Sequence, residues 1–231
     1  MSKSAIYTIL PQESTIDYDG HLSLMMFTAG CNFRCRYCHN PDLIPYTNDT
    51  MSIEELRNRL LLAKENWIDA VSISGGEPTM SSFLSETIKE IKSMGFSIKL
   101  DTQGSFPDQF EKSLPYIDYV AMDYKAPLKR LSELTQTPIQ TDAILTSLEM
   151  LKNCGTEYEI RTTVVPGFHT ENDMVEICNE IGTVKKYVLQ AFVPRDNVPD
   201  PAYRTKSRTP LPLLKEYQEC CRKYLNNVVV R

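Results

Sequence analysis

The sequence predicts an α/β fold built around a parallel sheet, and two observations support this prediction. Short apolar or β-branched runs alternate along the chain with longer amphipathic segments, which is the pattern of successive βα units. The chain has 231 residues, of which 42% are hydrophobic and 24% charged, so it is long enough to bury one sizeable core. We therefore expect a single domain over residues 1–231.

Six apolar runs are expected to be strands, and six amphipathic segments are expected to be helices. The strands cover residues 22–29, 70–74, 97–102, 119–124, 158–165 and 187–193. The helices cover residues 52–66, 82–94, 107–114, 142–153, 172–182 and 211–225. Ser52 and Glu55 form a capping-box pattern at the start of the first helix, and Gly95 ends the second. Six βα units suit a partial barrel or a doubly wound sheet, and in both folds the functional residues lie at the carboxyl ends of the strands.

Charge and hydropathy exclude several classes of partner. A net charge of −5 argues against nucleic acid, because neutralising phosphates requires clustered Lys and Arg. No apolar run approaches the length of a membrane span, and the N-terminal residues lack the apolar core of a signal peptide. We therefore expect a cytoplasmic protein that binds neither nucleic acid nor a membrane.

One long irregular segment, residues 194–212, is rich in Pro and Arg. Its basic residues are Arg195, Arg204, Lys206 and Arg208. The segment is a candidate lid or a docking loop for an acidic partner, and a plain surface connection is an equally good interpretation.

Three of the seven cysteines lie within eight residues, in the sequence GCNFRCRYCHNP. Cys31, Cys35 and Cys38 have the spacing C-x3-C-x2-C, which favours metal ligation in a reducing compartment over a disulfide framework. Three thiolates leave one coordination position open, as a substrate-binding metal site requires. The alternative is a zinc loop completed by His39 or Cys154. The four cysteines outside this loop (Cys154, Cys178, Cys220 and Cys221) are expected to be ordinary buried side chains.

Three further strand ends carry residues that suit a ligand site. The segment SISGGEPT at residues 72–79 follows the second strand, and its glycines let the backbone approach a ligand closely. The segments KLDTQG and AMDYKAP, at residues 99–104 and 121–127, place charged side chains where apolar packing would otherwise continue. Such charges need a ligand or a partner charge, and internal pairs between Asp123 and Lys125 or between Asp101 and Arg161 are the structural alternative.

The cysteine spacing, with the aromatic Tyr37 before the last cysteine, resembles the signature of the radical S-adenosylmethionine (SAM) superfamily. The resemblance implies a partial (β/α)6 barrel and a [4Fe–4S] cluster on Cys31, Cys35 and Cys38, with the fourth iron binding SAM. It implies contacts with SAM at Tyr37, Cys38, His39, Gly75, Gly76, Glu77, Asp101, Thr102, Asp123, Tyr124, Lys125 and Gln190. No side chain is expected to act as an acid or a base, because the cofactors carry the chemistry.

Segments spread over residues 14–192 look like the activating proteins of anaerobic ribonucleotide reductases. These proteins install a radical on a glycine of a separate enzyme. The resemblance therefore implies a glycyl-radical enzyme as partner, most simply an anaerobic ribonucleotide reductase, and an electron donor such as flavodoxin or ferredoxin. Two residues depart from the family pattern, which usually has Pro at the position of Asp19 and Asn at that of Gln103.

Two alternative functions remain at this point. A small-molecule radical SAM enzyme, for example one of deazapurine synthesis, shares the cysteine loop and the Gly-Gly-Glu segment, and it would turn over without a protein partner. A non-catalytic iron–sulfur carrier or a zinc module would bind no SAM.

Overall fold

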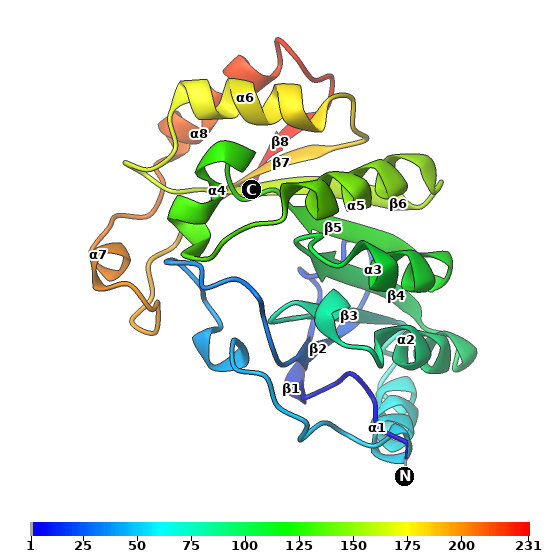
Figure 1. The fold of residues 1–231 in the computed structure, drawn as a ribbon. Coiled ribbons are helices and arrows are strands. Elements are labelled where there is room, and N and C mark those ends of the chain that lie inside the picture. Colours follow the sequence, from blue (N-terminus) through cyan, green and yellow to red (C-terminus); the bar gives the residue numbers. More distant parts are fainter. Residues whose placement is uncertain (1) are drawn as a thin grey trace. The chain divides into compact units, whose positions relative to one another are not determined.

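The computed structural model describes residues 2–231, which divide into two compact units (Figure 1). Unit 1 comprises the residues up to 32, residues 42–121 and residues 142–157. Unit 2 comprises residues 33–41, 122–141 and 158–231. The single domain expected over residues 1–231 stays a prediction.

The strands of unit 1 follow one another in the sheet in the order in which they occur in the chain. They are β1 (Thr8–Ser14), β2 (Ser23–Thr28), β3 (Ala70–Gly75) and β4 (Ser97–Thr102). Strand β1 is antiparallel to β2, whereas β2, β3 and β4 are mutually parallel. Met26, Ile73 and Leu100 are paired across the parallel strands and are fully buried, as expected for a sheet covered on both faces.

The helices of unit 1 begin and end largely where local sequence signals place them. They are α1 (Ile53–Glu65), α2 (Leu84–Ser93), α3 (Pro107–Ser113) and α5 (Thr141–Asn153), with 3-10 turns η1 (Pro41–Leu43), η2 (Pro78–Met80) and η3 (Leu114–Tyr116) nearby in the chain. Both hydrogen bonds of the predicted capping box between Ser52 and Glu55 are present. Gly95, at φ +82°, follows α2 and takes a left-handed conformation that suits glycine. Helix α2 packs against both α1 and α3 (Figure 1).

Unit 2 has three parallel strands, in the order β6–β7–β8. They are β6 (Glu157–Val164), β7 (Tyr187–Ala191) and β8 (Val228–Val230), while β5 (Tyr119–Asp123) ends in this unit. The helices are α4 (Leu128–Thr135), α6 (Glu171–Ile181), α7 (Pro201–Arg204) and α8 (Leu211–Cys221). Helix α8 packs against α6 and against β7 and β8, which buries Ile177 and Cys221 (Figure 1).

The predicted strands and helices are all present, with ends that differ by a few residues. Among the described residues, the strands β1 and β8, the helices α4 and α7 and the 3-10 turns η1, η2 and η3 were not predicted. Strand β1 carries Pro11 and a register shift between Ile9 and Glu13, which hide the alternation of an ordinary strand. The others are short, between three and eight residues, and a periodic pattern is weak over such lengths.

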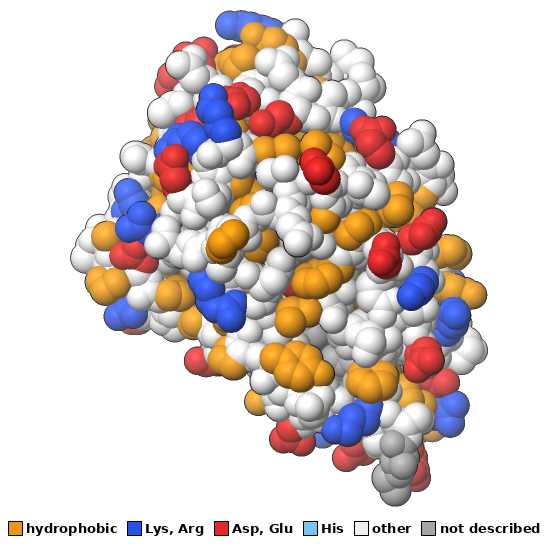
Figure 2. Space-filling model, viewed as in Figure 1, with side chains coloured by type: hydrophobic (Ala, Val, Ile, Leu, Met, Phe, Trp, Pro, Cys, Tyr) orange, Lys and Arg blue, Asp and Glu red, His pale blue; other side chains and the backbone are white. Residues whose placement is uncertain are grey.

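Charged side chains of both signs are interspersed over the face shown in Figure 2. Among residues 2–231, the helices include none with the length and apolar character needed to cross a bilayer.

Candidate functional site

The cysteine loop begins in unit 1, after β2. The backbone N–H of Gly30 donates to the Leu43 carbonyl at 2.9 Å, and that of Cys31 donates to Ile44 at 3.0 Å. These bonds tie the strand end to the segment that follows the loop. Cys31 is thereby held at the carboxyl end of β2, which is where the sequence places it.

Cys35 and Cys38 belong to unit 2, where a tight turn joins them. The N–H of Cys38 donates to the carbonyl of Cys35 at 3.1 Å. Cys35 is buried and Cys38 half-buried, and burial raises the pKa of the Cys38 thiol while Lys125 lowers it in part. A nearby cation favours the thiolate, which is the form that binds a metal.

Among the described residues, no three His, Cys, Asp or Glu side chains are grouped so as to hold a single metal ion. A four-iron cluster requires a wider spacing of its ligands than a single metal ion, because each thiolate binds a different iron. The three thiols of the loop are the donor type that such a cluster takes.

The Gly-Gly-Glu segment follows β3 in unit 1, and neither of its glycines has room for a side chain. Gly75 has φ +127°, and a Cβ there would lie 2.3 Å from the carbonyl oxygen of Thr28. A Cβ on Gly76 would lie 2.2 Å from the carbonyl oxygen of Gly30. The backbones at the ends of β2 and β3 therefore approach each other at a distance that only glycine permits.

Glu77 is buried and joins the ends of β3 and β4. Its Oε1 accepts hydrogen bonds from the Thr102 hydroxyl at 2.6 Å and from the N–H of Thr79 at 3.1 Å, and its Oε2 accepts from the N–H of Gln103 at 2.9 Å. Burial raises the pKa of Glu77, and the hydrogen bonds from Thr102 and Thr79 only partly offset this. Glu77 and Thr102 thus fix the loops and face each other.

Asp101 and Gln103, on either side of Thr102, have other partners in unit 1. The ammonium group of buried Lys99 lies 2.9 Å from Oδ1 of Asp101. The side-chain amide of Gln103 donates to Oδ1 of Asn32 at 2.9 Å. Gln103, which departs from the family pattern, therefore contacts the residue next to Cys31.

In unit 2, the end of β5 carries three charges in contact. Oδ2 of Asp123 lies 2.9 Å from the ammonium group of Lys125, and Oδ1 lies 2.9 Å from Nε of Arg161 on β6. Burial alone would raise the pKa of Asp123, but Arg161 and Lys125 hold it well below its ordinary value. Burial lowers the pKa of Lys125, yet Asp123 raises it well above its ordinary value. The internal pair of Asp123 and Lys125 is thus present, and Arg161 is a second cationic partner of the Asp123 carboxylate.

Tyr37 and His39, which flank Cys38, pack around Phe192. The Tyr37 ring meets the Phe192 ring edge-on, with centroids 6.2 Å apart, and its buried hydroxyl has no hydrogen-bond partner among the residues that the structure describes. Burial raises the pKa of Tyr37, so this hydroxyl keeps its proton and can donate to a ligand. The His39 ring stacks on Phe192, and its Nε2 donates to the carbonyl of Val193 at 2.8 Å.

Two other predicted SAM contacts lie in unit 2. The hydroxyl of Tyr124 donates to Glu180 on α6 at 2.8 Å, so this side chain is occupied by a structural contact. Gln190 lies half-buried on β7, opposite Thr163 of β6.

Sequence reasoning missed His169, which lies in the loop after β6 and is 3% exposed. Its Nδ1 accepts from the N–H of Val165 at 2.9 Å, so Nε2 carries the proton and donates to the carbonyl of Lys125 at 2.9 Å. His169 therefore fixes the backbone of Lys125. The only available signal was a histidine shortly after a strand, which by itself does not identify a partner.

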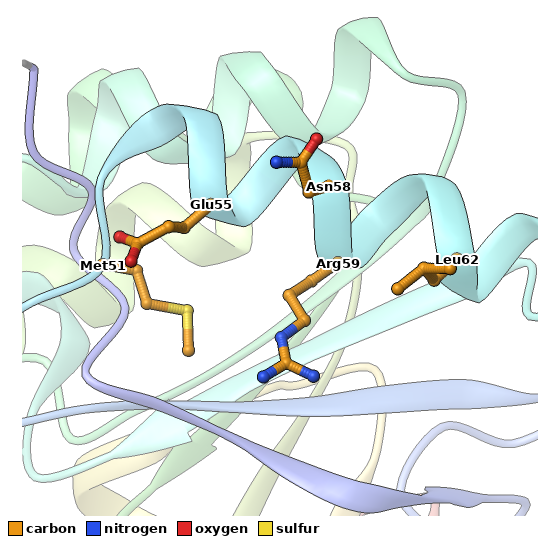
Figure 3. Close-up of a pocket in the computed structure, with 5 residues that line it drawn as sticks. All are labelled: Met51, Glu55, Asn58, Arg59 and Leu62. Carbon is orange, nitrogen blue, oxygen red and sulfur yellow. The ribbon is translucent and has the colours of Figure 1, made fainter.

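Two cavities in unit 1 are lined by other residues. One of about 230 Å³ is lined by Met51, Glu55, Asn58, Arg59 and Leu62, and Figure 3 shows Met51 before α1 and the other four side chains on the helix. Another of about 430 Å³ lies between β1 and α1 and shares Arg59 and Leu62. Neither contains a predicted site residue.

Comparison with known proteins adds three matches. A family model described as the Radical SAM superfamily matches residues 25–181. A protein of Methanocaldococcus jannaschii with the provisional name glycyl-radical enzyme activating enzyme is 33% identical over 229 residues, covering 94% of this chain and 92% of the relative. The pyruvate formate-lyase-activating enzyme of Staphylococcus aureus is 30% identical over 196 residues, covering 77% of each chain.

Among solved structures, Streptococcus suis SuiB bound to S-adenosylmethionine has a similar fold, with a TM-score of 0.66 and 16% identity. The match covers 87% of this chain and 48% of SuiB, so this chain spans about half the length of that protein. At this identity the likeness shows the fold alone.

Proposed function

This chain belongs to the radical SAM superfamily and, within it, to the glycyl-radical enzyme activating enzymes, and we propose that the enzyme it activates is an anaerobic ribonucleotide reductase. Membership of the superfamily confirms two expected cofactors, a [4Fe–4S] cluster and SAM. The expected fold class, mixed α/β with the partial barrel of radical SAM enzymes, is also confirmed.

Cys31, Cys35 and Cys38 are the proposed cluster ligands. The chemistry of the donors supports this, since three thiols in one loop supply three of the four positions of such a cluster and leave the fourth to SAM. The cation of Lys125, which partly offsets the raised pKa of Cys38, favours thiolate formation.

Three features of this chain are suited to binding SAM. At Gly75 and Gly76 the close approach of the backbones at the ends of β2 and β3 fixes the turn in which SAM would contact the backbone. Lys125 is a half-buried cation after the end of β5 and suits the SAM carboxylate. The unpartnered hydroxyl of Tyr37 is a buried donor that a bound ligand would satisfy.

When bound, the cluster and SAM supply the electron and the 5′-deoxyadenosyl radical that removes a hydrogen atom from a glycine Cα of the partner. The residues of this chain bind and orient the cluster and SAM. Glu77 and Thr102 hold the loops after β3 and β4 in register, and His169 holds the backbone of Lys125. The buried surroundings of Tyr37 and Phe192 exclude water from one side of the cysteine loop.

The choice of an anaerobic ribonucleotide reductase rests on one observation, the family-like segments spread over residues 14–192. The relative from M. jannaschii supports the broader class, because the match covers nearly its whole length and that of this chain. We further propose flavodoxin or ferredoxin as the electron donor and the cytoplasm as the compartment, since an iron–sulfur cluster held by thiolates requires reducing conditions.

Electron paramagnetic resonance tests the proposal. The reconstituted and reduced protein is mixed anaerobically with SAM and an anaerobic ribonucleotide reductase, and a glycine-centred radical signal is expected. A reductase whose radical-bearing glycine is replaced by Ala is the matched control and should give no signal.

A pyruvate formate-lyase forms the second arm of the experiment. A radical on the lyase but not on the reductase would replace the proposed partner and keep the activase function. Productive consumption of SAM with a small metabolite alone, and no radical on either protein, would favour the small-molecule alternative.

A further inference from the structure

The backbone of the cysteine loop is anchored on one side by the end of α4, within unit 2. The N–H of Arg34 donates to the carbonyl of Thr135 at 2.8 Å. The N–H of Arg36, which lies between Cys35 and Cys38, donates to the carbonyl of Leu134 at 3.0 Å. Because two of its backbone N–H groups are hydrogen-bonded to α4, the loop segment 34–36 has little freedom to move.

The same residue is held from a second direction by the segment 193–204, which contains α7. The N–H of Asp200 donates to the carbonyl of Arg36 at 3.3 Å, and Nε of Arg36 lies 2.5 Å from Oδ2 of Asp200. The guanidinium group also lies over the ring of Tyr203, 5.0 Å from its centroid. Both backbone groups and the side chain of Arg36 are thus bound.

Asp200 is itself fixed, because it is the N-cap of α7 and its Oδ1 accepts from the N–H of Ala202 at 2.8 Å. One carboxylate therefore caps the helix with one oxygen and holds Arg36 with the other. The interaction joins residues that are 164 positions apart in the chain.

A second set of contacts holds the other end of the loop to this segment. His39 donates to the carbonyl of Val193 at 2.8 Å, and the side-chain amide of Asn197 donates to the carbonyl of His39 at 2.8 Å. The ring of Tyr203 meets Phe192 edge-on, 6.2 Å between centroids. Residues on both sides of Cys38 are therefore bound to the segment 193–204.

Two of the basic residues expected to attract an acidic partner, Arg204 and Lys206, form hydrogen bonds within unit 2. Arg204 donates to the carbonyls of Val198 and Pro199, and Lys206 donates to the carbonyl of Pro166 at 2.8 Å. These hydrogen bonds restrict the movement of the segment. They favour a structural role over that of a docking loop, whose basic side chains would be solvated.

We propose that the segment 193–204 acts as a clasp that holds Cys35 and Cys38 in the geometry of the bound cluster, with the Arg36–Asp200 pair as its latch. The inference rests on the proposed cluster ligands. Thiolates on a loose loop must lose backbone and side-chain freedom when they bind iron, and a loop that is already fixed loses less. Arg36 is then a positioning residue, acting through its two cysteine neighbours.

The test compares Arg36→Gln with Arg57→Gln in the reconstituted full-length protein. The Arg57–Glu90 pair is the control, because its Nε–Oε1 distance is also 2.5 Å and it joins α1 to α2 within unit 1. Under anaerobic reducing conditions, Arg36→Gln should release iron to a chelator about tenfold faster than the unaltered protein, as expected for the loss of one half-exposed charge-assisted contact. Arg57→Gln should release iron at the unaltered rate.

Two further measurements separate a positioning role from general destabilisation. The thermal midpoint of the metal-free Arg36→Gln protein should match that of Arg57→Gln within about 2 °C, because both lose one partly exposed pair. The conservative variant Arg36→Lys, which keeps a cation opposite Asp200 and leaves the cap of α7 in place, should release iron within about threefold of the unaltered rate.

Iron release from Arg36→Gln at the unaltered rate, or release from Arg36→Lys as fast as from Arg36→Gln, would overturn the clasp while leaving the activase function intact. Failure of the unaltered protein to take up a four-iron cluster would overturn the cluster assignment and the clasp together. Loss of glycyl-radical formation on every partner, with a retained cluster and the expected release rates, would overturn only the proposed function.

Discussion

The ammonium group of Lys125 lies 2.9 Å from a carboxylate oxygen of Asp123 at the end of β5. Arg161 binds the other oxygen, so the carboxylate has two cationic partners. An ammonium group has three N–H donors, so Lys125 can bind a second carboxylate beside that of Asp123. The carboxylate of SAM would supply that second acceptor.

Lys125→Ala is therefore expected to weaken SAM binding by roughly tenfold or more, the usual effect of losing a charge-assisted hydrogen bond. Asp123 keeps Arg161 as a partner in this variant, so the protein should fold and retain its cluster. Anaerobic equilibrium dialysis with labelled SAM measures the affinity. Lys129→Ala is the control, because Lys129 is exposed and pairs with Glu176. Equal affinities in the two variants would return Lys125 to a purely structural role.

Gly76→Ala is expected to destabilise the protein by more than about 3 kcal/mol, because the added Cβ would lie 2.2 Å from the Gly30 carbonyl oxygen and the backbone must move. Gly155→Ala provides the comparison. Gly155 has φ +78° and open space around a Cβ, so only the conformational cost of about 1 kcal/mol is expected there. Urea unfolding of the metal-free proteins gives both values, and similar losses would show that the close approach at Gly76 is relaxed at little cost.

His169 predicts a stability change in mild acid. Burial lowers its pKa to about 4 from the ordinary 6.5, although the hydrogen bond to Lys125 acts in the opposite direction. The unfolded chain therefore binds the proton first as the pH falls, and the folded state loses stability between about pH 6.5 and 4, by up to roughly 3 kcal/mol. The full contribution of the neutral ring is present above this range.

Unfolding free energies of the unaltered protein and of His169→Gln, measured from pH 7.5 to pH 4.5, test this expectation. At pH 7.5 the variant should be the less stable, since a Gln amide replaces the ring imperfectly between Val165 and Lys125. The gap should narrow steadily in acid, because Gln does not titrate. A gap that stays constant with pH would assign the acid sensitivity to other groups.

Local signals in the sequence were sufficient for much of the fold. The capping box of Ser52 and the helix stop at Gly95 depend on neighbouring residues alone, and both are present. The apolar run Leu24–Phe27 of the buried strand β2 was likewise recognisable. Strand β1 was missed because Pro11 and a register shift interrupt its pattern.

Site residues could be predicted where their chemical type alone indicates a role. They could not be predicted where the role depends on contacts with residues that are distant in the sequence. Cys35, Cys38 and Lys125 stand out because thiols and a buried cation are unusual at strand ends. His169 does not stand out, because its partners are the backbone groups of Val165 and Lys125. Residue spacing identifies candidate ligands, but the supporting contacts require the folded chain.

The last prediction concerns the cysteines outside the loop, which already have local roles in the fold. Cys178 on α6 and Cys221 on α8 are buried and share a side-chain hydrogen bond. The thiol of Cys154 donates to the carbonyl of Leu151 at 3.1 Å. Because the fold already accounts for these thiols, Cys178→Ala and Cys221→Ala should cost about 1–2 kcal/mol of stability and leave the iron content unchanged.

Iron and sulfide analysis after anaerobic reconstitution tests this expectation together with the ligand assignment. The unaltered protein and the Ala variants of Cys154, Cys178, Cys220 and Cys221 should each hold about four irons per chain. Ala variants of Cys31, Cys35 and Cys38 should each lose the stable cluster, because two remaining thiolates hold it too weakly to survive desalting. A folded Cys154→Ala or Cys221→Ala protein that fails to retain iron would mean that a protein side chain occupies the fourth position. SAM would then have no iron to bind, and the assignment of the three-cysteine site would be wrong.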